Sequence, residues 1–170
     1  MSINNKLIFT CVASFVLYSC QPEPITNNTQ ELVTTVRLQF KNSGKTFQYK
    51  IVNSIVTKDT IRLSIANSDT FEVSILDESK ATAINLTNEI KAEKNDHQLF
   101  YTPSPGLNLS TRYLDKDDKD FPIGLSMEIT TSSAGKGNLR IVLKHQPDIK
   151  NGSSITGSTD ADVTFPVIIE

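Results

Sequence analysis

The side chains best suited to chemistry are two histidines, and the chain has no others. His97 opens an apolar run, and His145 ends another run in phase with the apolar residues before it. Asp115 and Asp117 belong to an acidic loop between these two runs. Imidazole nitrogens and carboxylate oxygens together suit zinc, copper or nickel. The four residues are therefore candidate ligands of a transition-metal ion, and histidines that only hydrogen-bond at a core margin are the alternative.

Topology, rather than a local motif, brings these candidates together, because the sequence contains no HxH or HExxH spacing. Consecutive antiparallel strands reverse direction. The start of the strand after His97, the 115–120 loop and the end of strand 138–145 should therefore lie at one end of the molecule. The first strand should begin at that end too, which would turn these loops toward a membrane that holds the N-terminus.

The 115–120 loop reads Asp-Lys-Asp-Asp-Lys-Asp and also offers oxygen atoms to a hard cation such as calcium. It lacks the turn glycine and the closing glutamate of an EF-hand, and its two lysines dilute the negative charge. We interpret it as a solvated hairpin tip.

Enzymes and nucleic-acid-binding proteins are the two classes that the residues argue against. The sequence has no Gly-x-Ser-x-Gly elbow, and Gly135-Lys136-Gly137 is too short for a phosphate loop. Glu89 and Glu93 fit one face of a short helix, but nothing places a substrate between them. Lys and Arg number 17 against 19 Asp and Glu, spread along the chain, so the basic footprint of a nucleic-acid-binding protein is missing.

The front of the chain predicts export and lipidation. Lys6 precedes an apolar run, 7–19, that is too short to remain as a membrane-spanning helix. The run ends in Leu-Tyr-Ser before Cys20, which resembles a bacterial lipobox whose cysteine becomes the lipidated first residue. Cys11 would leave with the leader, so the mature chain would have no thiol for a disulfide.

Three segments follow from this assignment. Residues 1–19 are the signal peptide, 20–31 are the lipidated cysteine with a flexible, proline-containing tether, and 32–170 are one folded domain. The tether can extend roughly 35–40 Å, at about 3.3–3.6 Å per residue.

From Leu32 onward, the apolar residues recur with a period of two, which predicts half-buried strands. Counting one short strand near 98–102, about nine strands are expected, separated by Asn-, Gly- and Pro-rich turns. We predict an all-β, immunoglobulin-like antiparallel sandwich, with a closed β-barrel as the alternative. A short helix is expected near 87–94 with Thr87 as its N-cap, and Pro166 indicates that the last strand lies at an edge.

Several stretches resemble a group of Bacteroidetes-type outer-membrane lipoproteins that are often encoded beside TonB-dependent receptors. They are residues 96–103, the 115–120 loop with the 122–125 segment, the 139–147 run and residues 159–166. Related sequences sometimes have a label that implies a type 1 periplasmic-binding fold, which requires βαβ units that this strand pattern lacks. The resemblance implies an outer-membrane location and an accessory role in nutrient uptake.

Two functions remain open at this point. The first is a lipid-anchored binding module that delivers a metal or small nutrient to a TonB-dependent receptor. The second is a structural or protein-interaction module without a small ligand, for which Val33, Val52, Leu76, Val142 and Ile168 would have to form an exposed apolar patch. The segment after Cys20 holds few acidic residues, which favours the periplasmic face of the outer membrane over the cell surface.

Overall fold

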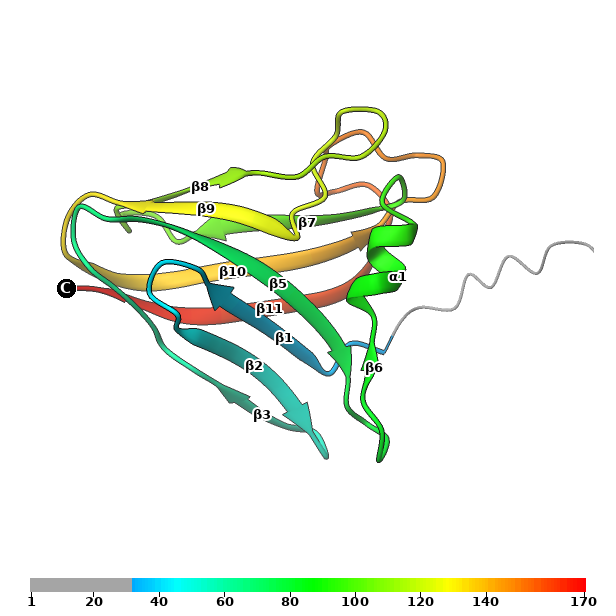
Figure 1. Cartoon of the computed structure of the whole chain (residues 1–170), viewed down its shortest axis with the longest axis horizontal. Coiled ribbons are helices and arrows are strands. Elements are labelled where there is room, and N and C mark those ends of the chain that lie inside the picture. Colours follow the sequence, from blue (N-terminus) through cyan, green and yellow to red (C-terminus); the bar gives the residue numbers. More distant parts are fainter. Residues whose placement is uncertain (1–31) are drawn as a thin grey trace, which may run out of the picture.

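The computed structural model describes residues 32–170, which form two β-sheets packed face to face (Figure 1). The predicted signal peptide, Cys20 and the tether lie outside the described residues. Alternating apolar and polar side chains give each strand one buried face, and the two buried faces meet in a single core. The sandwich prediction is confirmed. The described strands form two separate sheets, so the closed-barrel alternative is wrong.

The larger sheet has seven strands in the order β3-β2-β1-β5-β9-β8, with β6 paired to β5. All its pairs are antiparallel. Its strands are β1 (Thr35–Phe40), β2 (Thr46–Val52), β3 (Ile55–Lys58), β5 (Ser68–Asp77), β6 (Ile84–Asn85), β8 (Leu109–Tyr113) and β9 (Ser126–Thr131).

The smaller sheet has four strands in the order β4-β11-β10-β7. Its strands are β4 (Ile61–Leu63), β7 (His97–Pro103), β10 (Gly135–His145) and β11 (Ser158–Ile169). The β11–β4 pair is parallel, whereas β10 pairs antiparallel with both β7 and β11. This sheet carries both histidines.

Aromatic side chains link the two sheets across the core. Phe71 of β5 lies edge-on to Tyr101 of β7 with ring centroids 5.9 Å apart, and Tyr49 of β2 meets Phe165 of β11 at 6.2 Å. Phe71 and Phe165 are fully buried. Burying such large apolar rings is the main source of stability for a domain that has no cysteine among its described residues.

Three details differ from the sequence-based expectations. The described residues form eleven strands rather than nine, because β3 and the two-residue β6 add short pairings that periodicity does not reveal. Helix α1 (Thr87–Ala92) is where it was expected, but Leu86 occupies its N-cap position, and the Thr87 hydroxyl bonds to the backbone of Ile75 instead. Pro166 does not mark an edge strand, because β11 lies between β10 and β4; however, β4 pairs only with the residues after Pro166.

One end of the sandwich gathers the predicted chemistry. His97 at the start of β7 pairs in register with His145 at the end of β10, and the 115–120 loop and the start of β1 lie at the same end (Figure 1). We call this end the histidine end. The strand-alternation prediction is confirmed. Among residues 32–170, no helix is long and apolar enough to span a membrane.

Candidate metal site

The two histidines form a stacked pair on the inward face of the smaller sheet. They are direct cross-strand neighbours, and the pairs that follow them, such as Leu143 opposite Leu99, point into the core. Their rings are parallel within 4°, with centroids 4.6 Å apart. The side chain of His97 is only 1% exposed, whereas His145 is half-buried at the rim. His97 is therefore held by its surroundings, whereas His145 is partly open to solvent.

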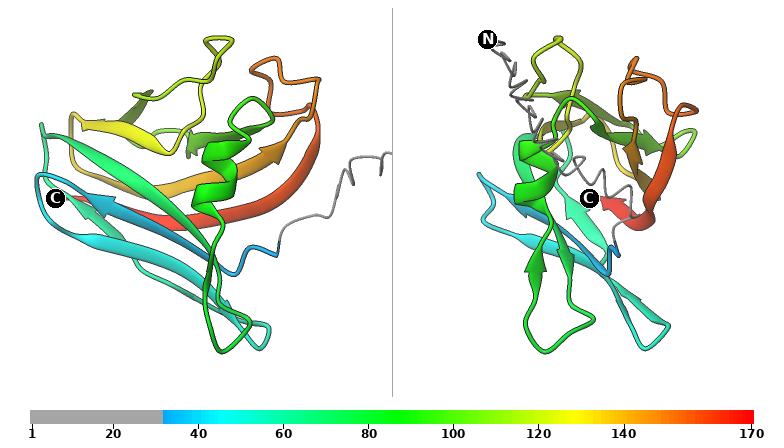
Figure 2. Two further views of the ribbon diagram at one scale, coloured as in Figure 1. Left: turned by 45° about the vertical axis from the view of Figure 1, so that its right-hand side comes forward. Right: turned by 90° about the vertical axis from the view of Figure 1, so that its right-hand side faces the viewer.

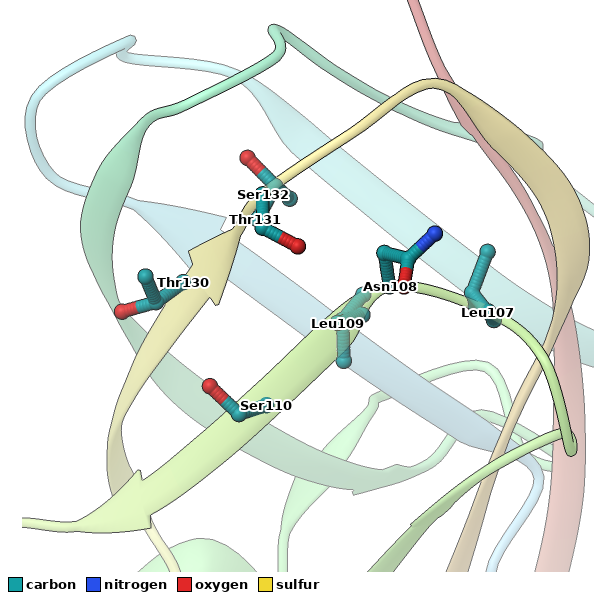
Figure 3. A pocket seen from close by; sticks show the side chains of 7 residues that line it. All are labelled: Leu107, Asn108, Leu109, Ser110, Thr130, Thr131 and Ser132. Carbon is teal, nitrogen blue, oxygen red and sulfur yellow. The ribbon is translucent and has the colours of Figure 1, made fainter.

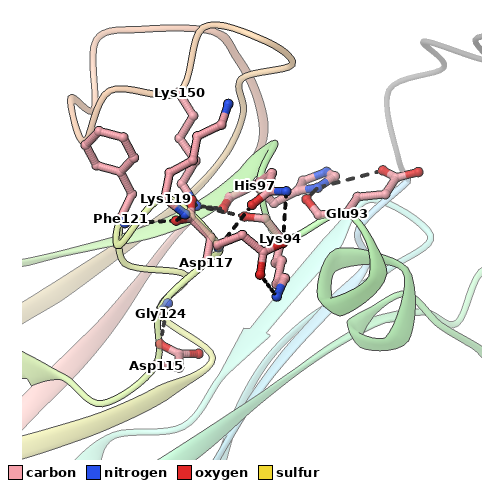
Figure 4. Close-up of polar contacts among 11 residues, drawn as sticks. Glu93, Lys94, His97, Asp115, Asp117, Lys119, Phe121, Gly124 and Lys150 are labelled. Atoms are coloured by element: carbon pink, nitrogen blue, oxygen red, sulfur yellow. Dashed lines mark hydrogen bonds and ion pairs between the residues drawn. The ribbon is translucent and has the colours of Figure 1, made fainter.

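Glu93, at the end of helix α1, approaches one nitrogen of the His97 ring (Figure 4). Its backbone carbonyl lies 3.3 Å from His97 Nδ1 and its carboxylate oxygen Oε2 lies 3.8 Å away. A carbonyl oxygen can only accept, so Nδ1 carries the hydrogen and neutral His97 keeps its lone pair on Nε2. A carbonyl that fixes the tautomer in this way is typical of histidines that bind metals.

Asp160 approaches the opposite nitrogen because of a β-bulge. The register between β10 and β11 shifts so that Leu143 faces Ala161 and Lys144 faces Thr159, which leaves Asp160 as the extra residue. A bulge turns a side chain that alternation would send outward. Asp160 Oδ2 lies 3.9 Å from His97 Nε2, and its side chain is 1% exposed.

Burial without hydrogen bonds makes the Asp160 carboxylate unusual. Neither of its oxygens receives a hydrogen bond from any residue in the described part of the chain. Burial raises its pKa above the usual range, although His145, His97 and Lys144 act in the other direction. Burial also lowers the pKa of His97, with the hydrogen bond to Glu93 and the charge of Asp160 opposing it. Burial thus disfavours both the ionised form of Asp160 and the protonated form of His97.

The distances suit a metal ion after small movements. The possible ligand atoms of Glu93, His97 and His145 all lie within 4.8 Å of one another, a group that does not include Asp160. Two ligand atoms on tetrahedral zinc are about 3.4 Å apart when each bond is about 2.0–2.1 Å, close to the observed separation of His97 Nε2 and Asp160 Oδ2. The lone pairs of two parallel rings do not converge, so His145 must rotate to share an ion with His97.

The carboxylate of Asp115, which was predicted as a ligand, accepts hydrogen bonds from backbone N–H groups instead. One oxygen accepts from Gly124 N–H at 2.8 Å, and the other accepts from Leu125 and Ser126 at 2.8 and 3.1 Å. These bonds fix the chain as it enters β9. The Asp115 carboxylate is not part of the group of ligand atoms around the histidines.

Asp117, the other predicted acidic ligand, forms a buried ion pair with Lys150 at 2.9 Å (Figure 4). Their side chains are 0% and 1% exposed. Lys150 also donates to the carbonyls of Lys94 and His97, each at 2.8 Å, and Asp117 accepts from the backbone of Lys119 and Phe121. Burial acts to raise the Asp117 pKa, but these hydrogen bonds outweigh it and leave the pKa below its usual value. The pair joins three loops at the histidine end.

The remaining acidic groups of the 115–120 loop are also engaged. Asp118 pairs with Lys94 and accepts from Asn95, while Asp120 lies 3.5 Å from Lys116. Each of the four carboxylates in this loop thus contacts a different partner, and they do not converge on one centre. This arrangement supports a hydrogen-bonded loop over a calcium loop.

A shallow cavity of about 310 Å³ lies at the opposite end of β8 and β9 (Figure 3). It is lined by Leu107, Asn108, Leu109, Ser110, Thr130, Thr131 and Ser132. None of these side chains titrates in the physiological range, so the lining offers no acid or base and no imidazole, thiol or carboxylate ligand.

The apolar patch that an interaction module would require does not form from the five predicted residues. Leu76 and Val142 are buried, and Val33 and Ile168 are half-buried. Val52 is exposed, but its apolar neighbours are in its own hairpin.

Compared with known proteins, the chain matches no family model and no curated protein. The candidate site therefore rests on its own geometry.

Sequence reasoning located the histidine pair and missed Asp160 and the role of Glu93. Glu93 precedes His97 by four residues, about one helical turn, and with a helix expected near 87–94 this spacing could have indicated their contact. No sequence signal marks the bulge that turns Asp160 inward.

Proposed function

We propose that this protein is a lipid-anchored, non-catalytic binding module of the bacterial outer membrane that holds a transition-metal ion at its histidine pair. The observation that supports this most directly is the buried Asp160 carboxylate beside the lone-pair nitrogen of His97. Two electron-rich groups facing each other in a buried site repel unless a cation lies between them.

Zinc, copper and nickel fit the donors better than calcium or magnesium do. Imidazole suits these three metals, and a carboxylate completes common mixed sites. In our proposal, His97 and Asp160 are the fixed ligands, the half-buried His145 turns to join them, and Glu93 orients His97 from behind.

The proposed physiological role is the capture of a metal or metal complex for a TonB-dependent receptor. The resemblance to lipoproteins encoded beside such receptors supports it, as does the position of the site. The start of β1 lies at the histidine end, so an N-terminal anchor would hold that end toward the membrane and a transporter in it. We place the protein on the periplasmic face.

Calorimetry on the detergent-solubilised full chain tests the metal. Zinc, copper and nickel are titrated into the wild type and into His97→Ala, His145→Ala and Asp160→Asn variants. We expect His97→Ala to abolish binding. Asp160→Asn should weaken it by more than the roughly 10- to 100-fold loss typical of an outer-shell partner. Asp162→Asn is the matched control, because Asp162 lies on the same strand and pairs with Arg140.

The outcomes separate the alternatives. An absence of heat with all three metals would contradict the proposal and favour an interaction module without a small ligand. If binding is lost in Glu93→Gln but kept in Asp160→Asn, the ion lies on the Nδ1 side of His97 and not beside Asp160. Co-purification of a TonB-dependent receptor with the tagged protein from outer membranes tests the partner.

A further inference from the structure

The hairpin formed by β2 and β3 extends beyond the sheet at the histidine end. We call residues 51–56 the hairpin tip. Strand β1 begins at Thr35 opposite Lys50, and after the backbone contact of Ile51 with Thr34 the hairpin continues as β2 paired with β3 alone. All six residues of the tip are exposed. Figure 2 shows it standing away from the loops of the histidine site.

The tip is apolar on both faces. Ile51 lies opposite Val56, and Val52 lies opposite Ile55, so one pair points to each side of the ribbon. Ile55 is 66% exposed. Asn53 and Ser54 form the turn, and none of the six residues is charged. A groove on a protein would cover one face of such a ribbon, whereas immersion in a fluid apolar phase covers both.

The chain toward the proposed anchor leaves beside this tip. The Ile51 N–H donates to the Thr34 carbonyl at 2.8 Å, which holds the beginning of the described chain against the hairpin. Only the tether of 11 residues separates residue 32 from Cys20, a reach of roughly 35–40 Å. An acyl chain on Cys20 would therefore keep the tip within reach of the bilayer.

We infer that the hairpin tip inserts into the boundary between headgroups and acyl chains of the membrane that holds the protein. This inference rests on the lipid anchor of the proposed function. From Ile51 to the turn the ribbon extends about 7–10 Å at about 3.3 Å per residue, which matches the depth of roughly 5–10 Å typical of interfacial segments.

The residues behind the tip suit the headgroup layer. Lys58 is exposed at the base of the hairpin and places a cation at the level of the headgroups, whereas the ring of Tyr49 opposite it packs into the core against Phe165. Lys50 is paired with Glu78 at 2.7 Å, and Asp59 follows Lys58, so the local charge is nearly balanced. Insertion is thus driven by apolar burial and does not require anionic lipid.

The test places an environment-sensitive fluorophore on the hairpin of the full-length, lipidated protein. Cys11 leaves with the leader and Cys20 is acylated, so Val56→Cys provides the single free thiol for nitrobenzoxadiazole. Ala134→Cys, in the turn between β9 and β10 at the far end, is the matched control. Both proteins are reconstituted into phosphatidylcholine vesicles with or without lipids brominated in the acyl chain, and palmitate labelling is measured in parallel.

We expect a blue shift and loss of emission with brominated lipid at position 56, and neither change at position 134. An acylated protein whose position-56 emission is unchanged would overturn the hairpin inference and leave the anchor intact. A shift without acylation would support the hairpin inference and contradict the anchor, and neither shift nor acylation would overturn both. A shift that depends on protein concentration and needs no vesicles would overturn insertion in favour of a second copy pairing at β3.

A second variant tests the same inference by affinity. In a Cys20→Ser background, Ile55→Asn should reduce co-flotation with phosphatidylcholine vesicles, whereas Ile155→Asn should not. Ile155 is 92% exposed and lies in the loop after β10, outside the hairpin. Equal flotation of the two variants, or flotation that requires phosphatidylglycerol, would overturn the inference.

Discussion

Asp117 and Asp160 are both buried aspartates at the histidine end, yet their surroundings differ. Asp117 is neutralised by Lys150 and receives backbone hydrogen bonds. Asp160 lies near imidazoles and receives no hydrogen bond within the described chain. The first residue therefore has the features of a structural contact, and the second has those of a ligand whose cation is supplied from outside.

A buried carboxylate without donors should destabilise the metal-free protein. We expect Asp160→Asn to raise the free energy of unfolding by about 1–3 kcal/mol, because the charge that lacks hydrogen bonds is removed. Urea unfolding of the wild type and the variant in the presence of a chelator measures this difference in the free energy of unfolding. Asp162→Asn, which loses the exposed pair with Arg140, should show no such gain. A less stable Asp160→Asn protein would show that the carboxylate is satisfied in the folded state.

The Asp117–Lys150 pair should give the opposite result. Asp117→Asn leaves a buried ammonium without its counter-ion, and we expect a loss of about 3 kcal/mol near neutral pH. The folded-state pKa of Asp117 lies below the usual 3.8 of an aspartate, so its contribution is present above that pH and disappears as the pH falls through the folded-state pKa. The stability difference between wild type and Asp117→Asn should stay constant from about pH 7 to about pH 5 and narrow as the pH falls below about 4.

Urea midpoints across that pH range measure this difference. Asp118→Asn is the control, because Asp118 pairs with Lys94 at the surface and should change little. A difference that stays constant with pH would contradict the assigned ion pair.

At the level of single residues, the sequence predicted the two histidines but not Asp160 and Glu93, the acidic residues that lie beside them. The register of His97 and His145 follows from alternation, because each is in phase with the core residues of its own strand. Asp115 and Asp117 were plausible ligands by type, but loop carboxylates also accept from backbone N–H groups and lysines, and composition does not distinguish these uses.

Among the elements, the turn from β10 to β11 has most influence on the site. Gly157 has a φ of +74°, and a Cβ there would lie 2.2 Å from the His145 carbonyl oxygen. The same connection contains Lys150, and it precedes the bulge at Asp160. The position of His145 thus depends on a glycine twelve residues later.

Replacing Gly157 by alanine tests this dependence. Gly44 is the matched control, because it also has a positive φ, +66°, but open space around its Cβ position. We expect Gly44→Ala to cost about 1 kcal/mol, mainly from the left-handed backbone. Gly157→Ala should add about 1–3 kcal/mol from crowding, and zinc affinity should fall only in this variant. Equal unfolding midpoints would contradict the argument.

Strand positions were predictable because the buried face repeats every second residue. Strands β3 and β6 could not be predicted in this way. Every residue of both is exposed, so neither strand has a buried face that would give an alternating pattern. The place of β11 was also missed. Pro166 excludes a hydrogen bond only at its own nitrogen, and β4 pairs with the residues after it, so the proline is compatible with an inner strand.

For the whole molecule, Cys20 remains the decisive prediction. We expect radiolabelled palmitate to be incorporated into the wild-type chain and not into Cys20→Ser, because only a thiol can form the thioether to lipid. Cell fractionation should move the variant from the membrane to the soluble fraction. An unlabelled wild-type chain would contradict lipid attachment and leave the histidine site unaffected.

The placement of β11 also bears on how the protein is made. This strand joins β4, which is synthesised about a hundred residues earlier, to β10, and it supplies Val163, Phe165, Val167 and Ile169 to the core. The four-stranded sheet cannot assemble until residues 158–169 have emerged. A polypeptide that we propose is threaded through a translocation pore would therefore stay unfolded during the passage and complete its native structure on the far side.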